Sequence, residues 1–262
     1  MNFSFRRGAS ALVGYAFLVI SFAGRTEAAS TARLFPTTNG IVKYRMTMKG
    51  AMPNNAINNS VITMTWINNG ARFRQDMTMN VSAGAGAGAG AGKMTMKSWS
   101  IFDGKSFYTA MPSGVPGQPA GRKIAMKMTL PPDYLKQILS GNASTMPGMK
   151  GVSSRVVGRG SVLGKMCEIR AMNIKQPQTN GQVKMWMWNK LPLRTDTNMT
   201  YSMRDPKGKK QPQKMTMTMS MVATQLNTNV NPSPSLFRVP ASYKIQDMSA
   251  MQKQMMQRMK QR

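Results

Sequence analysis

The strongest constraint on the fold is an alternation of apolar and polar residues that returns in several segments of the chain. Residues 42–49 read VKYRMTMK, with every second side chain apolar. The same period of two is found over residues 62–66, 76–81, 123–130 and 214–221. Successive side chains of a β-strand point to opposite faces of its sheet, so this period predicts half-buried strands.

Further segments raise the expected number of strands to about ten. They cover residues 94–102, 106–110, 154–158, 165–173, 183–189 and 194–201. Clusters of Gly, Asn and Pro separate the segments, and short connections favour antiparallel neighbours. We therefore expect one mainly β domain over residues 30–246, built as a single antiparallel meander with one apolar face and one polar, cationic face.

Two segments have helical features. Residues 131–139, PPDYLKQIL, begin with prolines, which the first turn of a helix tolerates. Residues 247–262 carry methionines three or four positions apart, opposite basic side chains, which predicts an amphipathic, Met-rich basic helix. Three roles are open to it: packing on the sheet, closing an apolar cavity, or lying on a membrane surface.

A strict Ala-Gly repeat occupies residues 83–92, between two of the expected strands. Gly-rich sequence of this kind forms flexible chain. We interpret the repeat as an expanded hairpin loop without a binding site.

The N-terminal segment has the three parts of a signal peptide. Arg6 and Arg7 supply positive charge, residues 11–23 are apolar, and small residues follow at 28–30. The apolar stretch is shorter than the roughly 20 residues that a membrane-spanning helix needs. We therefore expect residues 1–29 to be removed on export and the mature protein to work in a bacterial periplasm. No cysteine stands at the cleavage point, so a lipid anchor is not expected. No later segment is apolar for long enough to span a membrane, so no transmembrane segment is expected after signal cleavage.

The chain is strongly basic, with 36 Lys and Arg against 8 Asp and Glu and a formal net charge of +28. About +26 remains once the signal peptide is removed. Such a charge indicates anionic partners; for an exported protein an anionic membrane surface is a better candidate than nucleic acid, which is not expected. Adaptation to an acidic environment, where carboxylates and histidines titrate, explains the same composition, and both explanations stay open.

The residues that enzymes most often use are missing or scattered. The chain has no histidine, hence no histidine-based triad, general base or metal ligand. The acidic residues stand singly along the sequence. Cys167 shares one face of its segment with Ile169 and Ala171, which predicts a buried small hydrophobic side chain. We expect neither enzymatic activity nor a cofactor.

Methionine is unusually frequent, with 29 residues in 262. Several Met-x-Met pairs each point two thioethers the same way from a strand. Thioethers are ligands for Cu(I), and the candidate copper site is the run Met215, Met217, Met219 and Met221. Every pair also falls where the alternation requires an apolar residue. Packing alone, or a pliable surface for acyl chains of variable shape, is therefore an alternative explanation.

Four segments resemble motifs of one group of periplasmic proteins. They are residues 100–108 (SIFDGKSFY), 162–168 (VLGKMCE), 183–194 (VKMWMWNKLPLR) and 236–244 (LFRVPASYK). The first is similar to the Asp-Gly hairpin and aromatic strand of LolA/LolB-type lipoprotein carriers. The other three resemble the Leu-Gly-Lys-x-Cys, Leu-Pro-Leu-Arg and Phe-x-Val-Pro-x-x-Tyr segments of an uncharacterised periplasmic branch of that superfamily.

The resemblance implies a strongly curved antiparallel sheet, an incomplete barrel, with helices covering its concave apolar face. In the carriers this cavity holds lipoprotein acyl chains. We therefore expect a non-enzymatic carrier for a lipid or lipoprotein acyl chain. The alternatives are a periplasmic Cu(I)-binding protein and a cationic, envelope-associated structural protein. The expected cavity lining is Tyr44, Met46, Met64, Trp66, Met126, Met128, Met185, Met187, Met217 and Met219.

Overall fold

The computed structural model describes residues 39–50, 56–67, 72–82, 93–110, 123–129, 152–176, 179–203 and 213–249. This part of the chain forms twelve strands and one short 3-10 helix, η3 (Pro234–Phe237). The strands are β1 (Gly40–Gly50), β2 (Ala56–Ile67), β3 (Arg72–Ser82), β4 (Lys93–Phe102), β5 (Ser106–Ala110), β6 (Ile124–Thr129), β7 (Val152–Val162), β8 (Lys165–Gln176), β9 (Thr179–Trp188), β10 (Leu191–Met203), β11 (Gln213–Asn227) and β12 (Lys244–Asp247).

All twelve strands belong to one sheet, in the order β12-β6-β5-β4-β3-β2-β1-β11-β10-β9-β8-β7. The sheet consists of two meanders, β1–β6 and β7–β11, joined where β1 pairs with β11. The prediction of a single sequential meander was therefore wrong at this point. The prediction of a purely antiparallel sheet was also wrong, because β12 runs parallel to β6, with Lys244 opposite Ile124.

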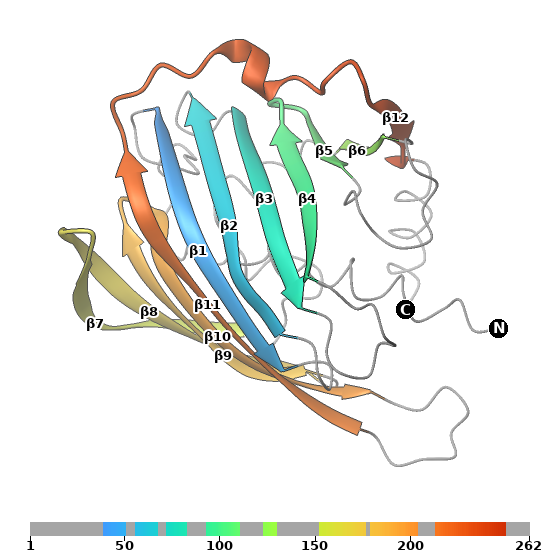
Figure 1. Cartoon of the computed structure of the whole chain (residues 1–262). Helices are drawn as coiled ribbons and strands as arrows, with labels where there is room; N and C mark the ends of the chain where they lie inside the picture. The colour runs from blue at the N-terminus through green and yellow to red at the C-terminus, as the bar shows by residue number, and fades with distance from the viewer. Residues whose placement is uncertain are drawn as a thin grey trace.

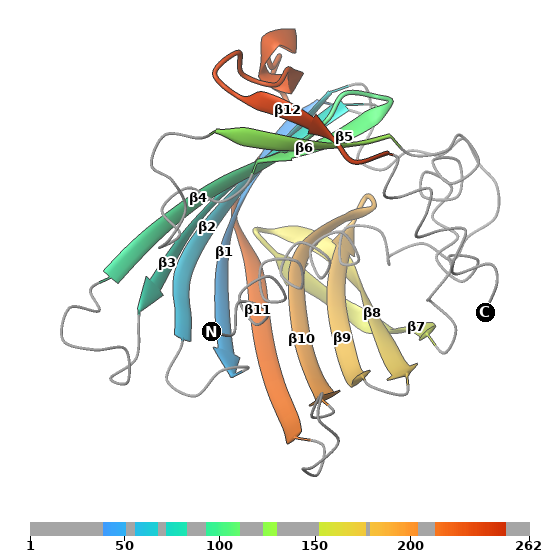
Figure 2. The ribbon, with the colours of Figure 1, turned by 90° about the vertical axis from the view of Figure 1, so that its right-hand side faces the viewer.

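The sheet is strongly curved and does not close into a barrel. Its two outer strands, β12 and β7, are not paired with each other. Figures 1 and 2 show β1–β4 and β8–β10 on opposite sides of the concave space. The mainly β, open curved sheet predicted from the sequence is confirmed.

The predicted helices cannot be placed on this sheet. Residues 131–139 lie outside the described residues, as does the predicted helix from residue 250 onwards. Asp247, the expected first residue of the second helix, ends strand β12 instead. The signal peptide and the Ala-Gly repeat also lie outside the described residues; the repeat connects β3 to β4. Helices covering the concave face therefore stay a prediction.

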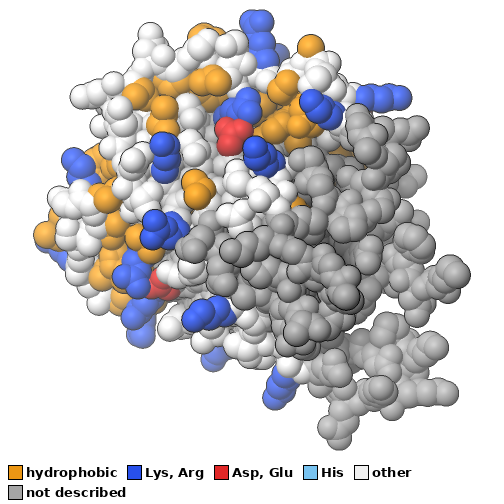
Figure 3. All heavy atoms as spheres, viewed as in Figure 1, with side chains coloured by type: hydrophobic (Ala, Val, Ile, Leu, Met, Phe, Trp, Pro, Cys, Tyr) orange, Lys and Arg blue, Asp and Glu red, His pale blue; other side chains and the backbone are white. Residues whose placement is uncertain are grey.

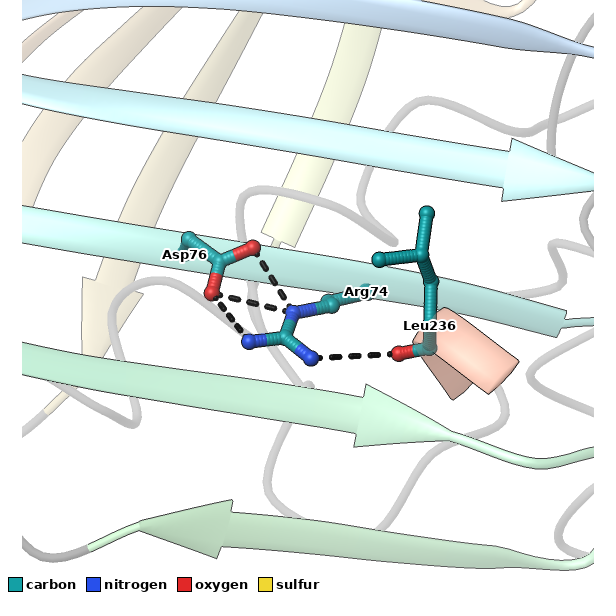
Figure 4. Close-up of polar contacts among 3 residues, drawn as sticks. All are labelled: Arg74, Asp76 and Leu236. Atoms are coloured by element: carbon teal, nitrogen blue, oxygen red, sulfur yellow. Dashed lines mark hydrogen bonds and ion pairs between the residues drawn. The ribbon is translucent and has the colours of Figure 1, made fainter. Parts of the chain in front are cut away.

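The two faces of the sheet can be told apart at β3. Figure 4 shows Arg74 and Asp76 on the side of β3 that faces away from the other half of the sheet, which is the convex face. Alternation along the strand then places Phe73 and Met77 on the concave face. The register carries this assignment to β1 and β11, where Tyr44 and Met46 are on the concave face and Lys43 and Arg45 on the convex one.

The convex face over β3–β6 is covered by the segment that follows β11. Phe237 of η3 is buried there with Trp99 and Ile101 of β4. The Arg74 guanidinium donates to the carbonyl oxygen of Leu236 (3.2 Å), as Figure 4 shows. The segment then enters β12 and pairs with β6. This packing fixes one end of the sheet and leaves the convex face of β1 and β9–β11 to solvent.

Candidate functional site

The largest group of buried apolar side chains lies on the concave face of β1, β2 and β11. Alternate residues of these strands point to this face, and those that belong to the group are 9% exposed or less. Six predicted lining residues belong to this cluster: Tyr44, Met46, Met64, Trp66, Met217 and Met219. The sheet register, more than any local motif, brings them together, because β1 lies between β2 and β11.

Trp66 is the largest fully buried side chain of this face. A Cβ atom on Gly40, which pairs with Trp66 across the strands, would lie 2.1 Å from the ring carbon Cζ2. Only glycine leaves room for the indole at this point. Gly40 therefore positions the aromatic end of the apolar face.

Tyr44 ties the two meanders together. Its hydroxyl donates to the main-chain oxygen of Pro192 in β10, at 2.9 Å. Burial raises the pKa of the Tyr44 phenol far above its ordinary value, because an anion without water around it is costly. Tyr44 is therefore a neutral structural donor and not an acid or base near neutral pH.

Methionine side chains from adjacent strands meet on this face. Met46 is opposite Met221, and Met48 is opposite Met219. Met217 is opposite Met199 of β10. Directly opposed residues of antiparallel strands have Cβ atoms about 4.5–5.5 Å apart. The structure thus gathers thioethers that the sequence shows only as scattered pairs.

Three buried hydroxyls interrupt the apolar surface. Within the described residues, Ser60, Thr195 and Thr197 have side-chain oxygens without a hydrogen-bond partner. Ser60 is opposite Met46, Thr195 opposite Met221 and Thr197 opposite Met219, so all three share the concave face with the methionines. Buried hydroxyls normally have a partner, and an unpaired one can serve a polar atom of a ligand.

The remaining predicted lining residues lie elsewhere on the sheet. Met185 is buried in a second cluster with Met172, Ile174 and Val183, and the partly buried Met187 packs against this cluster. On β6, Met126 is half-buried and Met128 is 38% exposed, and neither belongs to the described core clusters. The ten residues therefore fall in more than one part of the sheet, and a common cavity lined by all of them stays a prediction. Sequence reasoning could not separate them, because alternation shows which face a residue takes but not where its strand lies.

Several residues of the largest apolar cluster, the one on the concave face of β1, β2 and β11, are absent from the predicted lining. Met48, Ile62 and Met221 are buried there and were visible in the alternation. Phe73, Phe102 and Phe107 form a packed aromatic group with ring centroids 4.6–5.7 Å apart. Thr195 and Thr197 carry no such signal, since a Thr-x-Thr pair on a strand is typical of a solvent face.

Cys167 is buried, 1% exposed, as its apolar neighbours predicted. Its thiol donates to the carbonyl oxygen of Lys165 at 3.3 Å. Burial raises the pKa of this thiol, which disfavours the reactive thiolate.

The convex face is polar and positive. Asp76 and Asp196 are each paired with an arginine two residues before them, Arg74 and Arg194, at 2.7 Å. Figure 3 shows the few acidic side chains of this view beside basic ones, with further Lys and Arg spread over the surface. These two acids are thus neutralised locally, and the chain as a whole has 36 Lys and Arg against only 8 Asp and Glu.

One shallow depression of about 470 Å³ lies on this face, where Thr197 of β10 pairs with Met219 of β11. The side chains of these two residues point to the concave face, so the floor is main chain. Lys49, Lys184 and Arg194 line the depression with Asp196 and uncharged polar residues. Ser220 donates to Asp196 at 2.7 Å.

No group of three or more Cys, Asp or Glu residues suited to a metal ion occurs in the described part of the chain. Among the same residues, no helix is long and apolar enough to cross a membrane.

Comparison with solved structures finds similar folds. A chain of the Pseudomonas aeruginosa MucA/MucB complex matches with 14% identity and a TM-score of 0.38, covering 87% of this chain and 62% of that one. The lipoprotein LppX of Mycobacterium tuberculosis matches with 9% identity and a TM-score of 0.33, covering 86% and 99%. A LolA superfamily protein from Nitrosomonas europaea matches with 9% identity and a TM-score of 0.28, covering 85% and 97%.

The superfamily that the four sequence motifs resemble is thus found again among the matching structures. No family model matches the sequence. No curated protein matches it either. All three identities are 14% or lower and all three TM-scores 0.38 or lower, so these matches assign no function to this chain.

Proposed function

We propose that this protein is a non-enzymatic carrier that holds an acyl chain of a lipid or lipoprotein against the concave face of its sheet. The observation that carries the proposal is the apolar surface of β1, β2 and β11, built from Tyr44, Met46, Met64, Trp66, Met217 and Met219. Burying one methylene contributes about 0.8 kcal/mol to binding. An acyl chain has many methylenes and therefore needs a long apolar surface, and the surface of this protein spans three adjacent strands.

The chemistry of the lining suits a flexible ligand. Met side chains have three rotatable bonds and a polarizable sulfur, so they adapt to chains of different length and unsaturation. The unpaired hydroxyls of Thr195 and Thr197 lie on the same face. They can donate to the ester or amide carbonyl at the head of an acyl chain, which a purely apolar surface could not accept.

The proposed place of action is the periplasm. It rests on the signal-peptide features of residues 1–29, which lie outside the described residues. An acyl chain crossing that aqueous space needs a protein to shield it from water, and an open sheet with one apolar face provides such a shield.

Uptake of a fluorescent fatty acid by the purified mature protein tests the proposal. We expect saturable binding with a blue-shifted emission. Met219→Gln keeps the side-chain length and introduces an amide, so we expect binding to weaken about tenfold, the cost of an unpaired polar group. Met219→Leu should retain binding.

The control is Met166→Gln at a methionine that is 67% exposed. It should bind as the parent does. Equal binding by all three variants, or no uptake by the parent protein, would contradict the carrier proposal.

A second candidate function, Cu(I) binding, is favoured by the cross-strand methionine contacts. Met217, Met219 and Met221 share a face of β11 with the opposed Met46 and Met48 of β1. This arrangement offers several thioethers within one small area, which Cu(I) requires. Met215, the fourth residue of the predicted copper site, is half-buried on the same face.

Titration with Cu(I) against a competing chelator decides this point. If the folded protein has a copper site, it should bind Cu(I) more tightly than a free peptide with the sequence of residues 214–222 does. Such a site also predicts loss of binding in the triple variant Met217→Leu, Met219→Leu and Met221→Leu, while Met126→Leu with Met128→Leu leaves it unchanged. Binding no tighter than that of the peptide rules the copper site out.

A further inference from the structure

The turn between β7 and β8 has an unusual backbone. Its two central residues, Leu163 and Gly164, both have positive φ, 52° and 71°. This pattern is that of a type I′ turn, which favours Asn or Gly at the first position. The neighbouring β9–β10 hairpin has the favoured residue at its first position, Asn189 at φ 44°, followed by Lys190 at φ 72°.

Leucine in this conformation is sterically unfavourable, because its Cβ approaches the following carbonyl oxygen. Burial does not compensate, since Leu163 is 44% exposed. Residues kept in strained conformations concentrate at functional sites. The turn thus holds an apolar side chain outward where a polar residue would fit the backbone better.

The surroundings of Leu163 are both apolar and basic. Met166 is 67% exposed, and Val156 and Val157 farther along β7 are 53% and 43% exposed. Lys165 is exposed, and its ammonium lies 5.4 Å from the centroid of the half-buried Trp188 ring. Lys190, in the adjacent turn, is also exposed. We call these side chains, Leu163, Lys165, Met166, Trp188 and Lys190, the hairpin tip.

The hairpin tip lies at the margin of the molecule. Figure 1 shows the β7–β8 turn projecting from the left side, beside the β9–β10 turn. In Figure 3 the same side carries hydrophobic and basic side chains next to one another. The first acid of β8, Glu168, is already ion-paired with Arg170. The tip therefore combines exposed apolar surface with positive charge that no carboxylate of β8 cancels.

We propose that the hairpin tip inserts Leu163 and Met166 into the surface of an anionic lipid bilayer. Aliphatic side chains, a Trp ring and lysines are the residue types that settle at the boundary between head groups and acyl chains. The lysines would contact lipid phosphates, each adding attraction to an anionic surface. This membrane contact is distinct from the concave face and goes beyond the carrier function.

Co-sedimentation with lipid vesicles tests the proposal. The mature protein should bind vesicles of phosphatidylglycerol and phosphatidylcholine, and bind pure phosphatidylcholine much more weakly. Leu163→Asn should lower the affinity for the anionic vesicles about tenfold, since it removes a large apolar side chain from the bilayer. Asn favours the backbone conformation of this position, so the melting temperature should be unchanged or higher.

The matched control is Leu236→Asn, the same substitution at a leucine that is 39% exposed on η3. It should bind vesicles as the parent does. An environment-sensitive dye on Leu163→Cys, in a Cys167→Ala background, should shift to the blue with anionic vesicles. Unchanged binding by Leu163→Asn, an equal loss in Leu236→Asn, or no dye shift would overturn the proposal.

Fatty-acid uptake in solution separates this inference from the carrier function. Leu163→Asn should leave uptake unchanged, whereas Met219→Gln should weaken uptake and leave vesicle binding intact. Loss of both activities in Leu163→Asn would mean that the tip acts through the fold and not as a membrane contact.

Discussion

At the scale of single residues, the buried hydroxyl groups differ in whether they have a hydrogen-bond partner. Tyr44 is buried among methionines, yet its hydroxyl has a defined partner in Pro192, 148 residues away in the sequence. Thr195 and Thr197 are equally buried and have none in the described chain. The first hydroxyl stabilises the fold, and the other two are available to a ligand.

Tyr44→Phe should lower the free energy of unfolding by about 1–3 kcal/mol, because it leaves a buried carbonyl oxygen without its donor. Urea denaturation followed by circular dichroism measures the change. The comparison is Tyr201→Phe, because Tyr201 is half-buried and its hydroxyl forms no hydrogen bond within the described part of the chain; the loss there should be smaller. Equal losses would mean that the bond to Pro192 contributes nothing.

Cys167 should resist alkylation in the folded protein. Burial raises the pKa of its thiol, so iodoacetamide at mildly alkaline pH should modify it only after unfolding in urea. The unfolded thiol ionises at lower pH than the folded one, so the stability it contributes is present below the unfolded pKa and is lost as the pH rises toward the folded pKa. Rapid modification of the native protein, read by mass spectrometry, would contradict the buried position.

At the scale of elements, the β4–β5 hairpin shows how a turn fixes register. The Asp103 carboxylate accepts from the main-chain N–H groups of Lys105 and Ser106, both at 2.8 Å. Gly104 between them has φ 103°, which glycine adopts without strain. The hairpin then stacks Phe102 on Phe107, with ring centroids 4.6 Å apart.

Asp103→Ala should destabilise the protein by about 0.5–2 kcal/mol, as the loss of a capping carboxylate does. Asp103→Asn keeps an acceptor oxygen and should recover most of this loss. Thermal unfolding of the two variants and the parent measures both effects. If alanine and asparagine are equally destabilising, the carboxylate charge and not the turn geometry is what matters.

The predictability of the elements follows from how each is stabilised. Alternation located β1, β2, β6 and β11, because burying one side of a strand leaves a period of two in the sequence. β12 carried no such signal, since all four of its side chains are exposed and only its pairing with β6 defines it. The 3-10 helix η3 was missed for a related reason: its one buried residue, Phe237, gives no period.

The candidate site was predictable in composition but not in extent. The alternation identifies Met46 and Met219 as inward-facing, and the structure buries both. It could not show that β1 pairs with β11, a contact between distant parts of the chain that brings their methionines together. Nor could it show that Met128 lies toward the exposed end of β6 and outside the central cluster.

At the scale of the whole molecule, the concave and convex faces of the sheet differ in polarity and charge. The concave face gathers apolar side chains, and the convex face of β1 carries the exposed basic side chains of Lys43 and Arg45. Four of the described acids pair with nearby cations: Asp76, Glu168, Asp196 and Asp247. The unpaired positive charges repel one another and favour an expanded state.

Added salt should therefore stabilise the folded protein. Raising NaCl from low concentration to about 0.5 M shortens the screening length and weakens the repulsion, so we expect the melting temperature to rise. Differential scanning calorimetry measures the shift. A falling melting temperature would show that the surface ion pairs outweigh the repulsion between like charges.

Native mass spectrometry of the protein isolated from its own cells tests most directly whether the concave face holds an acyl chain. If the protein carries an acyl chain, a fraction of molecules should have one added mass that collisional activation releases as a lipid or a lipidated peptide. The added mass should be depleted in Met219→Gln and retained in Leu236→Asn, at an exposed residue outside both the concave face and the hairpin tip. Protein that consistently carries no lipid, or equal loading of both variants, would contradict the proposed carrier function.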